Sequence, residues 1–224
     1  MMDHAVPFSD AAPAEAELSA PLADFLTRAR TKLMSAPDIA GDPRRGDHEL
    51  TPEFRALVDQ RPVRAAAVLI PVIMRPEPTV LLTLRSAHLP SHAGQIAFPG
   101  GKIDPTDAGP LDAALREAEE EVGLERARVR PLGYLDSYLS RTGYRIVPVV
   151  AAVETDFGLR INPGEVDEAF EVPLDFLMSP ANHQRHSREA EGLIRTFHAM
   201  AYEKRFIWGI TAGILRTLYE RMYA

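Results

Sequence analysis

The chain of 224 residues carries a formal net charge of -7, is 46% hydrophobic and contains no cysteine. Its length suits one domain with additions or two small domains, and the lack of cysteine excludes disulfides, cysteine nucleophiles and thiolate zinc sites. The acidic balance argues against a nucleic acid polymer as partner, and no apolar run approaches the ~20 residues of a membrane span. The first residues lack the basic start and apolar segment of a secretory signal, so we expect a cytoplasmic protein with no membrane partner.

Residues 1–60 are predicted to form an N-terminal extension that is partly disordered and contains one helix. Residues 1–13 are small, polar and proline-containing, which favours disorder. Residues 14–34 repeat apolar side chains at three- and four-residue steps, which predicts the helix. Residues 35–52 are rich in helix breakers and predict a linker. A short second helix at residues 53–60 is left as an open alternative.

Residues 61–224 are predicted to form the compact domain. Two apolar runs of strand length, residues 64–74 and 79–86, flank a turn and predict a hairpin. Pro110 suits a first helical position and Gly123 suits a helix stop, which predicts a helix between them. Further strands are expected at 94–98, 129–139, 144–154 and on both sides of 202–205, with helices at 172–178 and 211–222. Because strands and helices do not alternate strictly, the pattern predicts a mixed α/β class rather than a doubly wound sheet.

The sequence "REAEEE" at residues 116–121 places four carboxylates on one short helix. Helical geometry puts Glu117, Glu120 and Glu121 within about 100° of one another, with Glu119 roughly opposite and Arg116 able to brace Glu120 or Glu119. A solvated acidic face is one interpretation. The three carboxylates border the apolar stripe, however, and two glycines lie upstream. Clustered oxygen ligands of this kind favour Mg²⁺ or Mn²⁺ carrying a polyphosphate.

Residues 101–124 resemble the Nudix box, whose pattern is G-x5-E-x7-R-E-U-x-E-E-x-G-U, with U aliphatic. The second half of the pattern fits, whereas the first half is one residue longer and has Ala108 where the pattern has glutamate. Asp107 or Asp104 could replace that glutamate, or its role could be absent. The resemblance implies an α/β (α+β) Nudix fold, with a mixed β-sheet sandwiched between helices, preceded here by the N-terminal helical extension.

The same resemblance implies a metal-dependent diphosphate hydrolase. Its metal ligands would be Glu117, Glu120, Glu121 and the carbonyl of Gly101, holding Mg²⁺ or Mn²⁺. The general base would be a box carboxylate or Glu165, with Asp167 and Glu168 as rivals in the same loop. The residues assigned to catalysis are Glu120, Glu121, Glu165 and Arg116. Members of this family are often dimers, so a homodimer is one expectation.

Residues 81–104 are similar to an additional signature of the coenzyme A diphosphatase branch of this family. This implies a small nucleotide substrate, coenzyme A or acyl-CoA, hydrolysed to 3',5'-ADP and 4'-phosphopantetheine or its acyl form. Arg85 suits a substrate phosphate, and the other residues assigned to the substrate are Ser86, His92, Gln95 and Gly100. Pairing of Arg85 with a surface carboxylate is the alternative.

Two other functions remain open from the sequence. One is a different Nudix substrate, such as ADP-ribose, NADH or a nucleoside triphosphate. The other is a Nudix-like binding module without turnover, against which the intact set of Glu117, Glu120 and Glu121 argues. Trp208 is assigned to core packing, with base stacking as the alternative.

Overall fold

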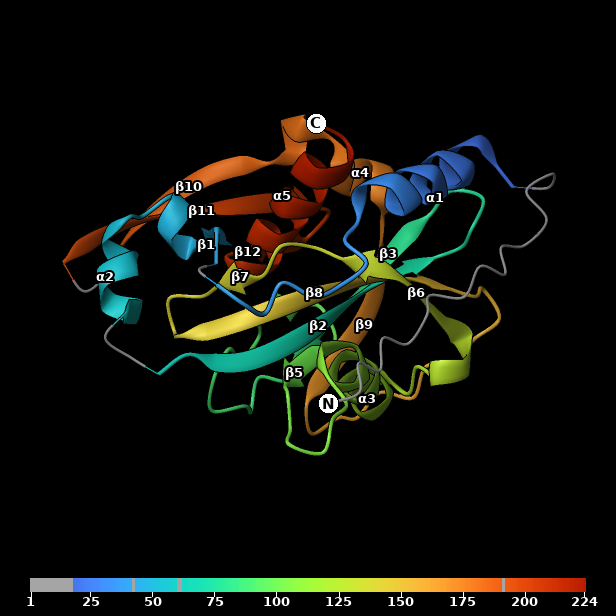
Figure 1. Cartoon of the computed structure of the whole chain (residues 1–224), viewed down its shortest axis with the longest axis horizontal. Coiled ribbons are helices and arrows are strands. Elements are labelled where there is room, and N and C mark those ends of the chain that lie inside the picture. Colours follow the sequence, from blue (N-terminus) through green and yellow to red (C-terminus); the bar gives the residue numbers. More distant parts are fainter. Residues whose placement is uncertain (1–17, 42, 60–61, 191) are drawn as a thin grey trace.

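The computed structural model describes residues 18–41, 43–59, 62–190 and 192–224. Within these residues a nine-stranded mixed sheet forms the centre of the molecule, and a second sheet of three strands lies beside it (Figure 1). The strands of the central sheet are β1 (Arg45–Gly46), β2 (Arg64–Ile73), β3 (Thr79–Arg85), β4 (Ile96–Ala97), β5 (Gly100–Lys102), β6 (Val129–Tyr134), β7 (Tyr138–Leu139), β8 (Tyr144–Val153) and β9 (Val166–Pro173). The second sheet holds β10 (Gln184–Ala190), β11 (Leu193–Tyr202) and β12 (Arg205–Trp208).

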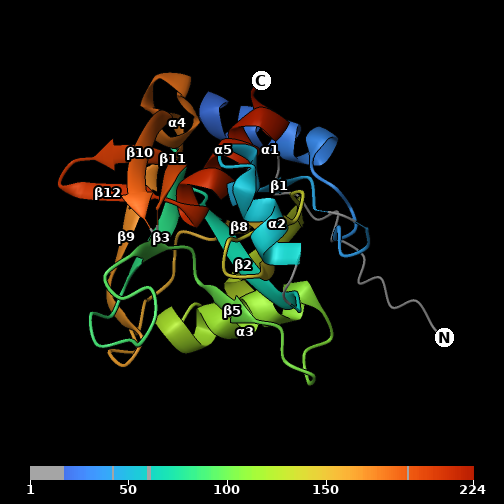
Figure 2. The same ribbon diagram turned by 90° about the vertical axis from the view of Figure 1, so that its left-hand side faces the viewer.

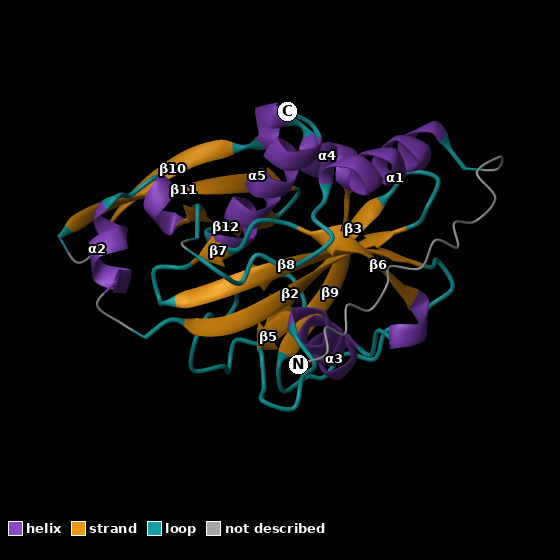
Figure 3. Ribbon diagram, viewed as in Figure 1, coloured by secondary structure: helices purple, strands orange, loops and turns teal. Residues whose placement is uncertain are grey.

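Helices cover both faces of the central sheet (Figures 2 and 3). They are α1 (Ala20–Lys32), α2 (Glu53–Asp59), α3 (Pro110–Val122), α4 (Leu174–Met178) and α5 (Ile210–Met222). Helix α3 lies on one face, whereas α1, α4 and α5 lie on the other. This arrangement confirms the predicted mixed sheet between helices. None of the described helices has the length and apolar character needed to cross a membrane.

Strand β2 shows why the sheet is buried on both sides. Its alternate residues Ala66, Ile70 and Val72 join a hydrophobic cluster with α1 and α5, whereas Ala67, Leu69 and Ile73 join another with α3. Successive strand residues point to opposite faces, so a strand covered on both faces is apolar at nearly every position. The continuous apolar run in the sequence is therefore the mark of a central strand.

The predicted hairpin of β2 and β3 is paired only next to its turn. The two strands meet at the antiparallel pairs Val72–Val80 and Ile73–Thr79. β2 also pairs with β8, in parallel and along all ten of its residues, and β3 pairs with β9. The predicted strand at 129–139 is two strands, β6 and β7, and each pairs with a different part of β8.

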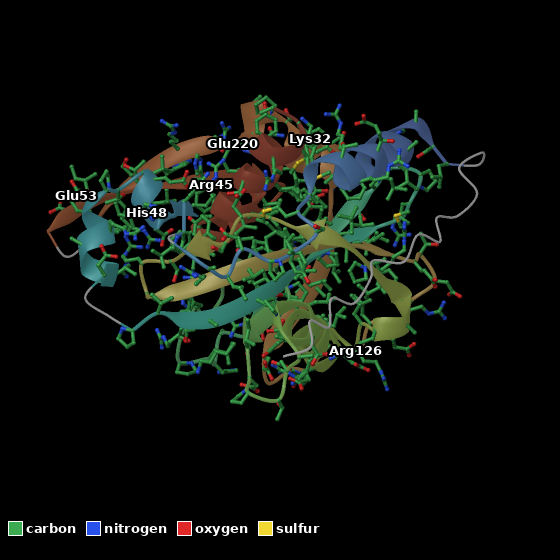
Figure 4. All side chains as sticks on the ribbon, viewed as in Figure 1. Lys32, Arg45, His48, Glu53, Arg126 and Glu220 are labelled. Atoms are coloured by element: carbon green, nitrogen blue, oxygen red, sulfur yellow. The ribbon has the colours of Figure 1, made fainter. Side chains whose placement is uncertain are left out.

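The predicted linker at residues 35–52 is wrong for its second half. Strand β1 lies there and pairs in parallel with β7, and Asp47 accepts hydrogen bonds from the Tyr138 hydroxyl at 3.0 Å and the Arg141 amide at 2.9 Å. Arg45 forms an ion pair of 2.7 Å with Glu220 of α5, and both are labelled in Figure 4. These contacts fasten the segment to the central sheet.

The extension before residue 60 contains the predicted helix as α1, and α2 lies at residues 53–59, where the sequence left open a short second helix. Leu22, Phe25 and Ala29 of α1 are buried in the same hydrophobic cluster as α5, so the amphipathic pattern marks a face that packs on the main core. The predicted disorder at 1–13 lies outside the described residues. The division of the chain at residue 60 stays a prediction.

Candidate active site

Helix α3 begins and ends where the sequence predicts. Pro110 occupies the first turn, and Gly123 takes the left-handed conformation, with φ of 70°, at the C-terminal cap. The face toward the sheet is formed by small or branched side chains, among them Ala113, Ala114 and Ala118. Alanine at these positions lets the helix approach β2 and β5 closely, and this brings the carboxylates of the helix to the sheet.

Two glycines of β5 allow this close approach. The Gly100 amide donates a hydrogen bond of 3.2 Å to Oε2 of Glu121. A Cβ atom on Gly101 would lie 2.5 Å from the carboxyl carbon of Glu117, and one on Gly100 would lie 2.6 Å from Cα of Val68. Any side chain here would therefore displace a carboxylate or the neighbouring strand, which explains the glycine pair upstream of the acidic helix.

Glu117, Glu121 and Glu165 converge at one point. Each offers a carboxylate oxygen, and these oxygens all lie within 4.8 Å of one another. Glu165 comes from the loop before β9, where the Asn162 side-chain amide donates to it at 3.2 Å. The Asn162 backbone amide donates to the Glu121 carbonyl at 2.9 Å, so the loop is tied to α3. Three hard oxygen donors at this spacing fit a divalent cation such as Mg²⁺ or Mn²⁺.

The electrostatics of the cluster also favour a cation. Glu121 is 1% exposed, and burial raises the pKa of its carboxyl to about 7, against the lowering effect of the Gly100 amide and Arg85. Burial likewise raises the pKa of Glu117, although Arg116 acts in the opposite direction. The two carboxylates and Glu165 repel one another. A divalent cation between the three groups would relieve both the burial and the repulsion.

Arg85 stands at the end of β3, beside this cluster. One of its N–H groups donates to Oε1 of Glu121 at 3.3 Å. Its backbone closes the following loop, since the Arg85 amide donates to the Gln95 carbonyl at 2.9 Å and the Gly94 amide donates to the Arg85 carbonyl at 3.0 Å. The sequence predicts Arg85 as a phosphate ligand. The structure places it beside the carboxylates, inside the same pocket.

A cavity of about 620 Å³ opens over the three carboxylates. The sequence-predicted residues that line it are Arg85, His92, Gln95, Gly100, Gly101, Glu117, Glu121 and Glu165. His92 has a positive φ of 57°, and its Nδ1 lies 2.9 Å from Oε1 of Gln95. Ser86 does not line the cavity. It is 1% exposed, and its amide donates to the Glu165 carbonyl at 2.9 Å.

Arg116 and Glu120 lie beside the cluster and outside the cavity lining. Arg116 makes a bidentate contact with Asp107, at 2.9 and 3.0 Å, and also donates to Glu117 at 3.0 Å and to Glu120 at 3.1 Å. The Glu120 side chain is 54% exposed. Of the two aspartates that could replace the glutamate missing at Ala108, Asp107 accepts the two hydrogen bonds of the bidentate contact with Arg116, whereas Asp104 lies 3.8 Å from it. The contact with Arg116 lowers the pKa of the Asp107 carboxyl.

The rivals of Glu165 have other partners. Asp167 accepts a hydrogen bond of 3.1 Å from the Ala87 amide, and Glu168 forms an ion pair of 2.5 Å with Arg205. Neither belongs to the cluster of three carboxylates.

Trp208 lines the cavity and also packs against Phe197, with ring centroids 5.4 Å apart. Core packing and base stacking therefore remain compatible for Trp208, and the roles of all these residues stay predictions.

Sequence reasoning missed the far half of the cavity. Arg64, Lys102, Tyr144 and Thr142 line it, together with apolar residues of β8 and α5. The signal for Arg64 lies in the period of two along β2, because Arg64, Ala66 and Val68 share one face of the strand. The partners from β8 carry no such local signal, since only the parallel pairing of β2 with β8 brings them there.

Comparisons with known proteins agree with this geometry. Residues 63–193 match the model of the NUDIX domain. The chain is 45% identical over 159 residues to the "Uncharacterized Nudix hydrolase NudL" of Yersinia pestis, covering 71% of this chain and 80% of that protein, and the same values hold for Yersinia pseudotuberculosis.

Solved structures of this kind are more distant. A Nudix hydrolase from M. smegmatis, RenU, is 25% identical with a TM-score of 0.44, over 51% of this chain and 73% of that one. The protein DR0079 from Deinococcus radiodurans is 16% identical with a TM-score of 0.46, over 72% and 83%. The family model spans more than half of the chain, and the NudL proteins share close to half of the aligned residues. The chain therefore belongs to the NUDIX domain family and is a hydrolase of phosphoric anhydride bonds.

Proposed function

We propose that this hydrolase cleaves the diphosphate of coenzyme A or acyl-CoA, releasing 3',5'-ADP and 4'-phosphopantetheine or its acyl form. One observation supports the proposal above the others. A single cavity joins the carboxylates of the acidic helix to Arg85, His92 and Gln95, which belong to the stretch that is similar to the coenzyme A diphosphatase signature. The residues expected to contact the substrate thus face the residues expected to hold the metal.

Glu117, Glu121 and Glu165 are the proposed core of a site for Mg²⁺ or Mn²⁺. Their fit to such an ion rests on three hard oxygen donors, their mutual distance of at most 4.8 Å and the raised pKa values of Glu117 and Glu121. Glu120 and the Gly101 carbonyl are further ligands that the family resemblance implies. When bound, the ion supplies charge neutralisation for the diphosphate and a water of lowered pKa.

The side chains around this site have distinct proposed tasks. Arg85 donates one N–H to Glu121, and its remaining N–H groups can donate to diphosphate oxygens in the cavity. Glu165 accepts the proton of the attacking water, and Asn162 holds its carboxylate in place through the 3.2 Å hydrogen bond. Glu121 is the alternative base. Arg116 is a positioning residue, because it contacts Glu117 and Glu120 without lining the cavity.

A product assay tests the proposal. The purified protein is incubated with Mg²⁺ or Mn²⁺ and, separately, with coenzyme A, an acyl-CoA, ADP-ribose, NADH or dGTP, and products are identified by mass. We expect 3',5'-ADP from coenzyme A, well above any product from the last three substrates. Glu121→Gln should lose turnover by orders of magnitude, whereas Glu119→Gln, an exposed carboxylate on the same helix, should keep it.

Other outcomes would overturn parts of the proposal. Preference for ADP-ribose, NADH or dGTP would keep the hydrolase and discard coenzyme A as the substrate. Full activity of Glu121→Gln would discard the metal-site assignment. The cytoplasmic location and the homodimer expected from the sequence remain predictions, and sedimentation velocity of the purified chain would measure the second directly.

A further inference from the structure

The cavity extends along β2, away from the three carboxylates. Gly100 pairs with Val68, Gly101 with Ala67 and Lys102 with Ala66, so the part of β2 beside the carboxylates is near Val68. A strand rises about 3.3 Å per residue. Ala66 therefore lies about 7 Å from that point along the strand, and Arg64 about 13 Å from it. Both residues line the same cavity as the carboxylates.

Two cations stand at this far end. Lys102 lies opposite Ala66, and Arg64 is two residues before Ala66, so their side chains are diagonal neighbours on one face of the sheet. Both are exposed and line the cavity. Among the residues that the structure describes, neither forms an ion pair with a carboxylate. Asp104 also lines the cavity, and it forms an ion pair of 3.8 Å with Arg116.

Arg64 is held in a fixed orientation without losing its charge. Its guanidinium lies over the Tyr144 ring, 4.0 Å from the centroid, and one N–H donates to the Thr142 carbonyl at 2.8 Å. A guanidinium has several further N–H groups in a planar fork that matches a phosphate. The contacts with Tyr144 and Thr142 reduce the entropy that Arg64 would lose on binding an anion.

Apolar side chains also line the cavity. Ile96, Ile146, Ile210 and Ile214 line it together with Trp208. The four isoleucines can contact a sugar or a base but have no group that can bind a phosphate. An anionic group at the far end would therefore find Arg64 and Lys102, whereas one near the carboxylates would find Arg85.

Arg85 lies beside the three carboxylates, away from Arg64 and Lys102. It donates to Glu121 at 3.3 Å, so it is placed to contact the diphosphate that is cleaved. Coenzyme A carries a further phosphate, the 3'-phosphate, one ribose ring away from its diphosphate. Lys102, opposite Ala66, lies two strand residues, about 7 Å, from the region beside the carboxylates. A second phosphate carried by a neighbouring ribose is therefore expected at that end of the cavity.

We propose that Arg64 and Lys102 form a second anion subsite, which binds a phosphomonoester one sugar ring away from the diphosphate. This inference rests on the proposed function, and the phosphomonoester is then the 3'-phosphate of coenzyme A. The subsite selects coenzyme A over diphosphates that lack this group, such as 3'-dephospho-CoA, ADP-ribose and NADH.

The first test compares kcat/KM for coenzyme A and 3'-dephospho-CoA in the wild type and in Arg64→Gln and Lys102→Met. Each variant should lower kcat/KM for coenzyme A by about tenfold, the effect of one lost charge-assisted hydrogen bond, and leave 3'-dephospho-CoA unchanged. Arg64→Lys should recover part of the loss. Arg188→Gln and Lys204→Met are matched controls, because both side chains are exposed and outside the cavity lining.

A second readout does not depend on turnover. Isothermal titration calorimetry in EDTA compares 3',5'-ADP with 5'-AMP as ligands of the wild type and of the double variant that combines Arg64→Gln with Lys102→Met. The wild type should bind 3',5'-ADP more tightly, and the double variant should bind the two alike.

The outcomes separate the subsite from the proposed function. If coenzyme A is cleaved but 3'-dephospho-CoA is cleaved equally well, the subsite is refuted and the proposed function stands. A loss that is equal for both substrates in the variants also refutes it. If coenzyme A is not cleaved at all, the proposed function fails, and the titration decides: preference for 3',5'-ADP that the double variant loses supports the subsite, and equal binding refutes it.

Discussion

Replacing Glu121 by glutamine should make the stability of the metal-free protein less dependent on pH. The carboxyl is 1% exposed, and burial raises its pKa from the ordinary value of 4.5 to about 7. The folded state therefore holds the proton more tightly than the unfolded state. The stability that the folded protein gains from protonation of Glu121 is fully present below pH 4.5 and is lost as the pH rises through about 7. At 1.4 kcal/mol per pKa unit, this change corresponds to about 3 kcal/mol.

Thermal unfolding in EDTA between pH 5 and pH 8 measures this effect. For a chain of this length, about 3 kcal/mol corresponds to a fall of about 6 to 12 °C in Tm, and Glu121→Gln should lack that part of the fall. The difference between the two proteins is the informative quantity, since the remaining titrating groups are common to both. Glu119→Gln is the matched control and should follow the wild type, because Glu119 is exposed. Excess Mn²⁺ at pH 8 should restore the stability of the wild type.

The reasoning would be refuted if the wild type and Glu121→Gln lost stability in parallel from pH 5 to pH 8. That result would mean that the buried carboxyl titrates near its ordinary pKa, so burial and repulsion would no longer explain the site. If Mn²⁺ restored the stability of Glu121→Gln as well as that of the wild type, the cation would be bound by other ligands.

Three further changes test other parts of the structure. Asp107→Asn should remove about 1 to 2 kcal/mol of stability by weakening the bidentate contact with Arg116, and urea unfolding should show no change if that contact is unimportant. Since the pKa of Asp107 is lowered, this stability is present above its unfolded pKa and lost as the pH falls through the folded value. Phe25→Ala should cost about 3 to 5 kcal/mol, measured in the same way, whereas an unchanged midpoint would make α1 dispensable for the core. Gly101→Ala should lower Mn²⁺ affinity about tenfold in calorimetry with little change in Tm, because its Cβ would displace the carboxylate of Glu117; unchanged affinity would contradict the close approach.

The acidic helix was predictable because its signals are local. Pro110 and Gly123 define its ends, and helical geometry alone brings Glu117 and Glu121 to one side. Geometry also placed Glu120 on that side, but it lies toward solvent, where Arg116 pairs with it. The approach of Glu165 could be expected only from the family resemblance, since a loop more than 40 residues further along the sequence supplies it.

Other features depend on strand pairings that a local sequence pattern does not show. Strand β10 reads "QRHSREA", without an apolar alternation, because it lies at the edge of the small sheet with mostly exposed side chains. Strand β1 has two residues within a breaker-rich segment, and only its pairing with β7 defines it. Arg64 looks like an ordinary strand-end cation until the parallel pairing of β2 and β8 places Tyr144 beneath it. These strands and the surroundings of Arg64 therefore follow from long-range strand pairing, which the local sequence pattern does not reveal.

The arrangement of charges around the cluster explains why the carboxylates can remain together in a folded protein. Arg85 neutralises one edge through Glu121, and Arg116 neutralises the other through Glu117. Neither arginine removes the cost of burial, because the pKa values of both carboxyls remain raised. The space between the two edges thus keeps an excess of negative charge that a cation can compensate. Because a cation and a proton compete for the same oxygens, binding of the metal must release protons near neutral pH, so metal affinity, activity and the stability of the fold are coupled through Glu121.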